Sequence, residues 1–259
     1  ALFVFLGLRR LGKPVAGLIA AGIGLLHPAA VEAVGWVSSQ TDLLVIFFFL
    51  ATLSFSIGPL TGKRFGLSIA LALLAYLSKD TALLLGPSIV GVCAYLLLFV
   101  RPLPAPARRI QLLGALHLGL WIGYLVARQV FLGRVLYETA DTSIAQMTAN
   151  LLAAWNELLW PIGRVFADRG FLHQETVPFF VGLLALPALF FWCLAARRHV
   201  AAIAIALMCL ALGPYMKSLD VTTFTGGGER YYYHPLWMFA VLCGLLFQPL
   251  WRAGWQRRA

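Results

Sequence analysis

The residues that could do chemistry gather in three short segments. Residues 27–42 place one histidine, His27, and two carboxylates, Glu32 and Asp42, in a single connection between apolar runs. Residues 78–80 form a tight turn in which a lysine stands between a serine and an aspartate, and these two charges could equally form only a local ion pair. Carboxylates can accept protons, and cations can stabilise developing anions. Both segments are therefore candidates for a reactive site.

The third segment, residues 226–235, joins three glycines to Glu229, Arg230 and a run of tyrosines that begins at Tyr231. Glycines beside an arginine are superficially similar to a phosphate-binding loop, but no Gly-Lys-Ser/Thr follows, so a P-loop is excluded. The tyrosines are typical of the aromatic belt of a membrane protein, and sugar stacking is the alternative.

The elements that must position these segments are long apolar runs. Hydrophobic residues make up 61% of the chain, charged residues only 12%, and the mean hydropathy is +0.85. Many runs approach the ~20 residues that cross a bilayer, and lipid permits helices but not open sheets. We therefore expect an all-α polytopic transmembrane bundle, a single domain over residues 1–259. A truncated first helix and about eight spanning helices are expected at 1–8, 14–26, 43–57, 65–77, 81–100, 110–131, 177–196, 200–215 and 232–250.

Charge sets the predicted orientation. The net charge of +10 does not indicate nucleic acid, because the basic residues lie in short connections between apolar runs. Alternate connections are basic, and the positive-inside rule makes them cytoplasmic. They hold Arg9, Arg10, Lys13, Lys63, Arg64, Arg101, Arg108, Arg109, Arg197, Arg198, Arg252, Arg257 and Arg258. The external segments are then about 27–42, 78–80, 128–176 and 216–232. The first two candidate segments lie in this external set, and the third, 226–235, begins in it. We expect a bacterial inner membrane protein whose site faces the periplasm.

The long external stretch is expected to contain an amphipathic helix on the membrane surface. Apolar residues recur there at helical spacing, at Ile144, Met147, Leu151, Trp155, Leu158 and Leu159, before Pro161. The sequence leaves two roles open for this helix, which could pack against the bundle or shape a substrate entrance. The four cysteines and His117 lie inside apolar runs, where a packing role is expected. The chain opens inside an apolar run, so N-terminal material is expected to be missing.

The candidate segments resemble the transmembrane and tetratricopeptide-repeat O-mannosyltransferases and their bacterial relatives, which belong to the GT-C glycosyltransferases. Four short motifs carry the resemblance in the family's order: His27-Pro28 through Glu32-Ala33-Val34 and Trp36 to Asp42-Leu43-Leu44, then Ser78-Lys79-Asp80, Leu158-Leu159-Trp160-Pro161 and Gly228-Glu229-Arg230-Tyr231. Three features depart from the family: Gln40 replaces a basic residue, Asp80 replaces glutamate, and the sequence contains no tetratricopeptide repeats. The family's catalytic acidic loop would lie upstream of Ala1.

The resemblance implies inverting transfer of a sugar from a polyprenyl-phosphate donor to a protein or glycan acceptor outside the membrane. It implies that Arg230 and Lys79, with Glu229 and Tyr231 beside them, bind the lipid phosphate.

The resemblance further implies that Glu32, Asp42 and His27 orient the acceptor or bind a divalent metal, although no cofactor is required by the sequence. A helix-capping or structural role for the two acids is equally open. We expect Glu32, Asp42, Lys79 and Arg230 to line one outward cavity. A transporter or flippase for a lipid-linked substrate, or a non-catalytic membrane scaffold, are the alternative functions.

Overall fold

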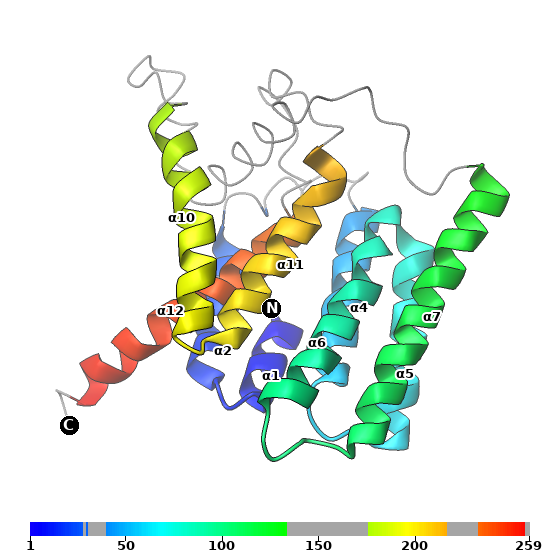
Figure 1. Ribbon diagram of the computed structural model, residues 1–259, viewed down its shortest axis with the longest axis horizontal. Helices are drawn as coiled ribbons and strands as arrows, with labels where there is room; N and C mark the ends of the chain where they lie inside the picture. The colour runs from blue at the N-terminus through cyan, green and yellow to red at the C-terminus, as the bar shows by residue number, and fades with distance from the viewer. Residues whose placement is uncertain (28–29, 31–39, 134–175, 217–232, 257–259) are drawn as a thin grey trace. The chain divides into compact units, whose positions relative to one another are not determined.

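The computed structural model describes residues 1–27, 30, 40–133, 176–216 and 233–256, and every regular element in these ranges is a helix. In chain order they are α1 (Leu2–Arg10), α2 (Pro14–Leu26), α4 (Gln40–Ser56), α5 (Gly62–Ser78), the 3-10 helix η2 (Asp80–Leu84), α6 (Leu85–Phe99), α7 (Ala107–Leu132), α10 (Thr176–Ala195), α11 (His199–Met216) and α12 (Tyr233–Gln256) (Figure 1). The all-helical class predicted from the apolar runs is confirmed for this part of the chain.

The chain forms two compact units. Unit 1 contains α1, most of α2, the helices from α4 to α7, and the C-terminal part of α12. Unit 2 contains α10, α11, the end of α2 and the beginning of α12. Unit 1 carries the described part of the candidate site.

In unit 1, α4 packs against α5 and α6 packs against α7. The turn from α4 to α5 contains Gly58 at φ +100°, a conformation that favours glycine. The Thr61 hydroxyl then caps α5 by accepting a hydrogen bond from the Arg64 amide at 3.4 Å. The connection from α5 to α6 is short because Lys79 is extended and η2 follows at once. The first connection makes α4 and α5 antiparallel neighbours, and the second returns the chain so that α6 also packs against α4.

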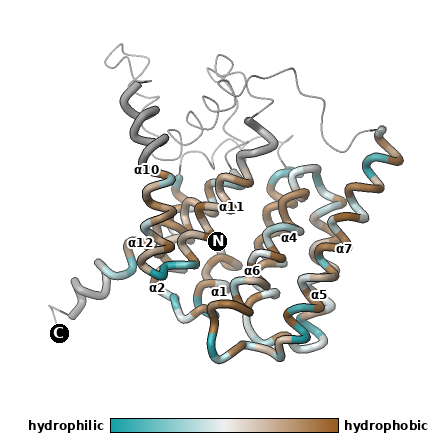
Figure 2. The backbone as a smooth tube through the Cα atoms, viewed as in Figure 1, coloured by the Kyte–Doolittle hydropathy of each residue, from teal (hydrophilic) through white to brown (hydrophobic). Residues whose placement is uncertain are grey.

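Two helices are long and apolar enough to cross a membrane by length and composition, Thr81–Phe99 and Ala107–Leu132. Five further apolar helices of 10–17 residues lie in the described ranges: Pro14–Leu26, Gln40–Ser56, Ala185–Ala195, His199–Ala211 and His234–Pro249. The two helices that are long enough to span a membrane do not reach the eight or so spans expected from the sequence. Along α4 to α7, hydrophobic residues follow the helices and hydrophilic ones concentrate at the turns (Figure 2).

Candidate functional site

The structure joins two of the sequence-predicted site residues in a long-range ion pair. Lys79 Nζ lies 2.6 Å from both Asp42 Oδ1 and Asp42 Oδ2, although 37 positions separate the two residues. The Asp42 side chain is 3% exposed and that of Lys79 is 31% exposed. A purely local ion pair within the 78–80 turn, the alternative left open by the sequence, is therefore not the partnership that Lys79 makes.

Local structure explains why the pair forms. Asp42 lies in the first turn of α4, where the helix dipole favours an anion. Lys79 ends α5 in an extended conformation, with φ −167° and ψ 157°, so its side chain leaves the helical path. Because α4 and α5 pack side by side and run antiparallel, the start of one meets the end of the other.

The pairing limits what each side chain can do. Both oxygens of Asp42 accept hydrogen bonds from the same ammonium group, so this buried carboxylate is engaged in holding Lys79. An ammonium group has three donors, and its partial exposure leaves Lys79 open to an anion. Asp42 is thus suited to positioning Lys79, and Lys79 to binding an anionic group.

A second cation, Arg128, lies at the same end of unit 1. Tyr76, one turn before Lys79 on α5, stacks on Tyr124 of α7 with ring centroids 4.8 Å apart. Arg128 follows on α7, where its Nη1 donates to Tyr124 Oη at 3.2 Å and its Cζ lies 5.7 Å from the ring centroid. The Arg128 residue is only 6% exposed. Arg128 belongs to none of the sequence motifs, although its four-residue spacing from Tyr124 is a usable signal.

Thr81 adds an unpaired hydroxyl close to the ion pair in sequence. Its Oγ1 is buried in the first turn of η2 and has no hydrogen-bond partner within the described residues. A buried hydroxyl without a partner is costly, so the position favours a polar ligand. The described end of unit 1 therefore holds two cations and a buried hydroxyl, and of the two cations Lys79 is the more exposed.

His27 belongs to unit 2 and follows the last residue of α2. Its ring meets that of Phe239 edge-on, with centroids 6.1 Å apart, and the residue is 8% exposed. The backbone amide of His27 continues the helical pattern by donating to the Ile23 carbonyl at 2.9 Å. This environment is that of a packed histidine at a helix end.

The remaining predicted site residues, Glu32, Glu229, Arg230 and Tyr231, lie outside the described residues, as does the expected amphipathic helix over residues 144–159. The expectation that Glu32 and Arg230 share a cavity with Asp42 and Lys79 stays a prediction.

His117 takes part in a buried hydrogen-bond chain in the middle of unit 1. Its Nε2 lies 3.1 Å from Ser68 Oγ, which lies 2.9 Å from Ser56 Oγ. Ser56 in turn donates to the Thr52 carbonyl at 2.8 Å, so the chain links α7, α5 and α4. The contacts of His117 are those of the packing residue expected from the sequence.

Within the described residues, no group of three His, Cys, Asp or Glu side chains is placed to hold a metal ion. Glu32 lies outside the described residues, so the divalent metal considered for His27, Glu32 and Asp42 stays a prediction.

Comparison with known proteins does not assign this chain to a family. No known protein family, curated protein or solved structure matches this chain. The proposal for its function therefore rests on the sequence motifs and on the geometry of the candidate site.

Proposed function

We propose that this chain belongs to a polytopic membrane glycosyltransferase of the GT-C type, which transfers a sugar from a polyprenyl-phosphate donor to a protein or glycan acceptor on the extracytoplasmic face. The ion pair between Asp42 and Lys79 carries the proposal, because it brings together two of the four motif segments. A buried carboxylate that holds a cation at a helix end is suited to presenting that cation to a phosphate.

The surface of α7 supports a membrane environment. Large apolar side chains stay exposed along the helix, at Leu112, Leu116, Leu118, Ile122, Val126, Val130 and Phe131. A contiguous apolar surface of this kind is unfavourable in water but matches the hydrocarbon of a bilayer. The remaining spans of the proposed bundle are the shorter apolar helices. Helices of 17 residues such as α4 and α5 reach about 26 Å, close to the ~30 Å of a hydrocarbon core.

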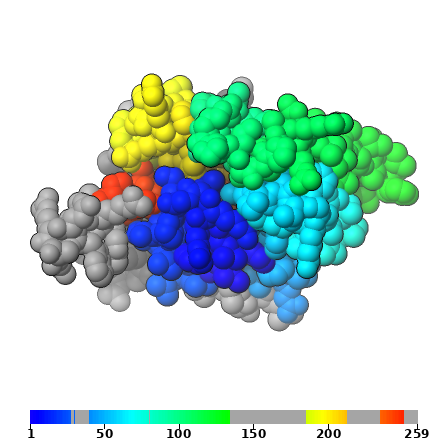
Figure 3. All heavy atoms as spheres, turned by 90° about the horizontal axis from the view of Figure 1, so that it is seen from below, coloured from blue at the N-terminus to red at the C-terminus, as the bar shows by residue number. Residues whose placement is uncertain are grey.

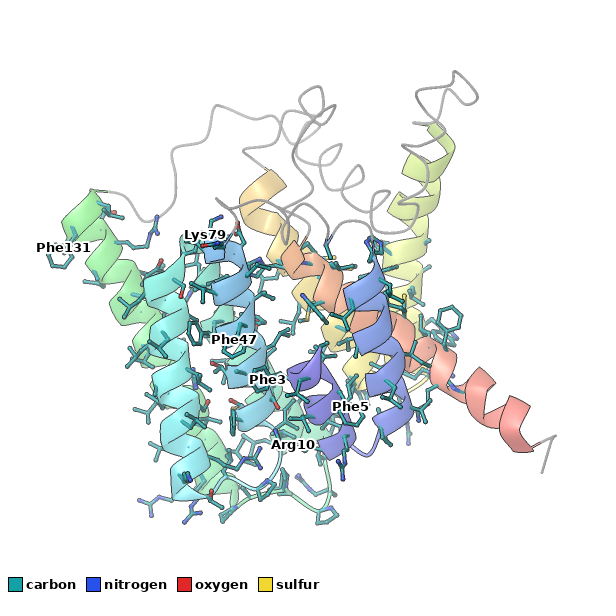
Figure 4. The ribbon with its side chains drawn as sticks, turned by 180° about the vertical axis from the view of Figure 1, so that it is seen from behind. Phe3, Phe5, Arg10, Phe47, Lys79 and Phe131 are labelled. Atoms are coloured by element: carbon teal, nitrogen blue, oxygen red, sulfur yellow. The ribbon has the colours of Figure 1, made fainter. Side chains whose placement is uncertain are left out.

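The distribution of acids supports the proposed orientation. All ten Asp and Glu residues lie in the four segments expected outside, and none lies in the basic connections. The end of unit 1 that carries Lys79 is the end opposite to Arg10, a residue of the basic connections (Figure 4). The positive-inside rule itself counts Lys and Arg in short connections, and the basic connections hold 13 of the 20 Lys and Arg residues.

The proposed reaction breaks one bond and forms one. The acceptor hydroxyl oxygen attacks the anomeric carbon, the bond from that carbon to the phosphate oxygen breaks, and polyprenyl phosphate leaves with the electron pair. An external carboxylate other than Asp42, such as Glu32, takes the acceptor's proton. Lys79 stabilises the leaving phosphate, and Arg230 is the second cation proposed for this role.

The test measures release of polyprenyl phosphate from labelled polyprenyl-phosphate mannose, and then from the glucose analogue, by the full-length protein in proteoliposomes. Lys79→Gln is expected to lower kcat by about 100-fold, because one preorganised cation is lost from the transition state. Lys79→Arg retains the charge and should keep more of the activity.

Lys63→Gln is the matched control, since it removes an exposed lysine from the first turn of α5, at the other end of the same helix. Equal turnover by Lys79→Gln and Lys63→Gln would contradict the proposal. Movement of intact labelled lipid across the bilayer without release of polyprenyl phosphate would instead indicate a flippase.

A further inference from the structure

A pocket of about 300 Å³ lies at the end of unit 1 opposite to Lys79. It is lined by the end of α1, the turn after α4 and the end of α6, and Arg10 and Arg101 contribute its positive charge. Tyr95, Leu96 and Phe99 form part of its wall. Figure 3 looks onto this face, where the blue residues of α1, the cyan residues of α5 and the green residues near position 100 are all visible. A volume of this size lies within the range of small-molecule sites.

Arg10 is fixed in place beside the pocket. Its Nη1 donates to the Ser54 carbonyl and to Ser54 Oγ, the latter at 2.7 Å, and its Cζ lies 5.7 Å from the ring centroid of Phe55. These contacts use only one nitrogen of the guanidinium group. The other nitrogens keep their donors for a ligand.

Arg64 raises the local positive charge. Its Nη2 donates to the Ile57 carbonyl at 2.8 Å and so closes the end of α4, while its Nε is buried without a partner in the described ranges. A Cβ on Gly58 would lie 3.3 Å from Arg64 Nη1 and 3.5 Å from Arg10 Cδ, so glycine allows both arginines to approach the turn. Desolvation lowers the pKa of both Arg10 and Arg64, and the charge of Arg10 lowers the pKa of Arg64 further.

Arg101 approaches from the end of α6. Its Nη1 donates to the carbonyls of Leu97 and Val100, each at 2.9 Å, which holds an exposed guanidinium group at the pocket. The only described bonds of Arg101 are to carbonyls of its own segment. Its remaining donors are therefore suited to an external anion.

No acid in the sequence of this region balances these charges. Residues 1–31, 43–79 and 81–137 contain no Asp or Glu. In the described residues, the one carboxylate–cation pair is Lys79 with Asp42, at the other end of the unit. Within the described residues, the contacts of these arginines are with backbone carbonyls, the Ser54 hydroxyl and the Phe55 ring, and none of these carries a negative charge, so the pocket stays net positive.

We propose that this pocket binds the phosphate group of an anionic phospholipid from the cytoplasmic leaflet. Guanidinium groups form strong, directional hydrogen bonds to phosphate oxygens, and the apolar wall suits the first carbons of the lipid. Basic pockets between membrane helices on the cytoplasmic side are suited to such headgroups. The proposal requires the membrane placement argued above but not the transferase activity.

The test adds phosphatidylglycerol or phosphatidylcholine to the full chain in detergent micelles and measures bound lipid by native mass spectrometry. Wild-type protein is expected to retain phosphatidylglycerol in preference to phosphatidylcholine. Arg101→Gln should weaken phosphatidylglycerol binding by about tenfold, the effect of losing one charge-assisted hydrogen bond. Arg10→Lys, which retains the charge, should weaken it less than Arg10→Gln.

Arg108→Gln is the matched control, since it removes an exposed arginine from the first turn of α7 that does not line the pocket. Melting temperatures of the lipid-free variants separate loss of binding from loss of folding, and Arg101→Gln leaves the Arg10 contacts with Ser54 in place.

Three results would overturn the proposal: equal retention of the two lipids, equal binding by Arg101→Gln and Arg108→Gln, or saturation by inorganic phosphate that phosphatidylglycerol cannot displace. The last result would point to a soluble phosphate compound. Lys79→Gln should leave lipid retention unchanged, so failure here is distinguishable from failure of the proposed transferase activity.

Discussion

At the residue scale, the pair of Asp42 and Lys79 is asymmetric. The carboxylate is almost fully buried, whereas almost a third of the lysine side chain is exposed. A buried charge that loses its partner is far more unfavourable than an exposed one, because water cannot replace the missing interaction. The two partners should therefore differ in their effect on stability when each is removed.

Lys79→Gln is expected to lower the free energy of unfolding by about 3 kcal/mol, because it strands the buried Asp42 carboxylate. Asp42→Asn should cost less, since the Lys79 ammonium can turn toward solvent. The double variant Asp42→Asn/Lys79→Gln should be close to Asp42→Asn alone. Denaturant unfolding of the full chain in micelles measures all three, with Lys63→Gln as the control. Additive effects of the two single replacements would show that the pair is not coupled.

At the element scale, close helix packing depends on small residues at particular contacts. A Cβ on Gly86 of α6 would lie 2.5 Å from the Cβ of Trp121 on α7. The same atom on Gly91, further along α6, would meet nothing within 4 Å. In membrane helices such small residues allow backbones to approach, and van der Waals packing then holds the helices together.

Gly86→Ala is expected to destabilise the α6–α7 pair by about 1–3 kcal/mol, because Trp121 must move to make room. Gly91→Ala should be neutral or slightly stabilising, by up to about 1 kcal/mol, since alanine is the better helix former and its methyl group enters open space. Thermal unfolding of the two single variants gives the comparison. Similar melting temperatures for both would mean that α6 and α7 do not approach as closely as described.

At the scale of the whole molecule, charge segregation supports the orientation that we propose in the membrane. The two ends of the helices in unit 1 differ in kind. One end holds the ion pair of Asp42 with Lys79, together with the acid Asp80 and the cation Arg128, whereas Arg10, Arg64 and Arg101 leave the other end positive with no acid in its sequence. The surface of the cytoplasmic leaflet is negative, so the positive end is favoured on that side.

Reporter fusions after Gly62, Ala107 and Arg198 are expected to report the cytoplasm, and fusions near Asp141 and Gly227 the periplasm. The physical reason is the alternation of basic connections along the chain. Paired alkaline phosphatase and fluorescent protein reporters measure each position from both sides. A cytoplasmic signal near Gly227 would remove Arg230 from the proposed site.

The helical elements could be predicted from the sequence, because the length of an apolar run and its end signals are local properties. Residues 14–26 form α2 as expected, and the expected helix at 65–77 extends by a few residues to become α5. The run at 81–100 is less regular than expected, since it begins with the 3-10 helix η2 before α6. The segments that hold Asp42 and Lys79 could also be recognised, since charges next to long apolar runs are unusual.

Which charges meet depends on how the helices pack. The sequence could place Lys79 in a turn beside Asp80, but the partnership with Asp42 arises from the antiparallel packing of α4 on α5. Arg128 was missed because its burial depends on Tyr124, which is itself placed by stacking on Tyr76 from another helix. The pocket lined by Arg10 and Arg101 could not be predicted for the same reason. In the sequence these two arginines lie in separate connections and indicate only the orientation of the helices. Pairing between distant residues depends on helix packing, which no local pattern contains.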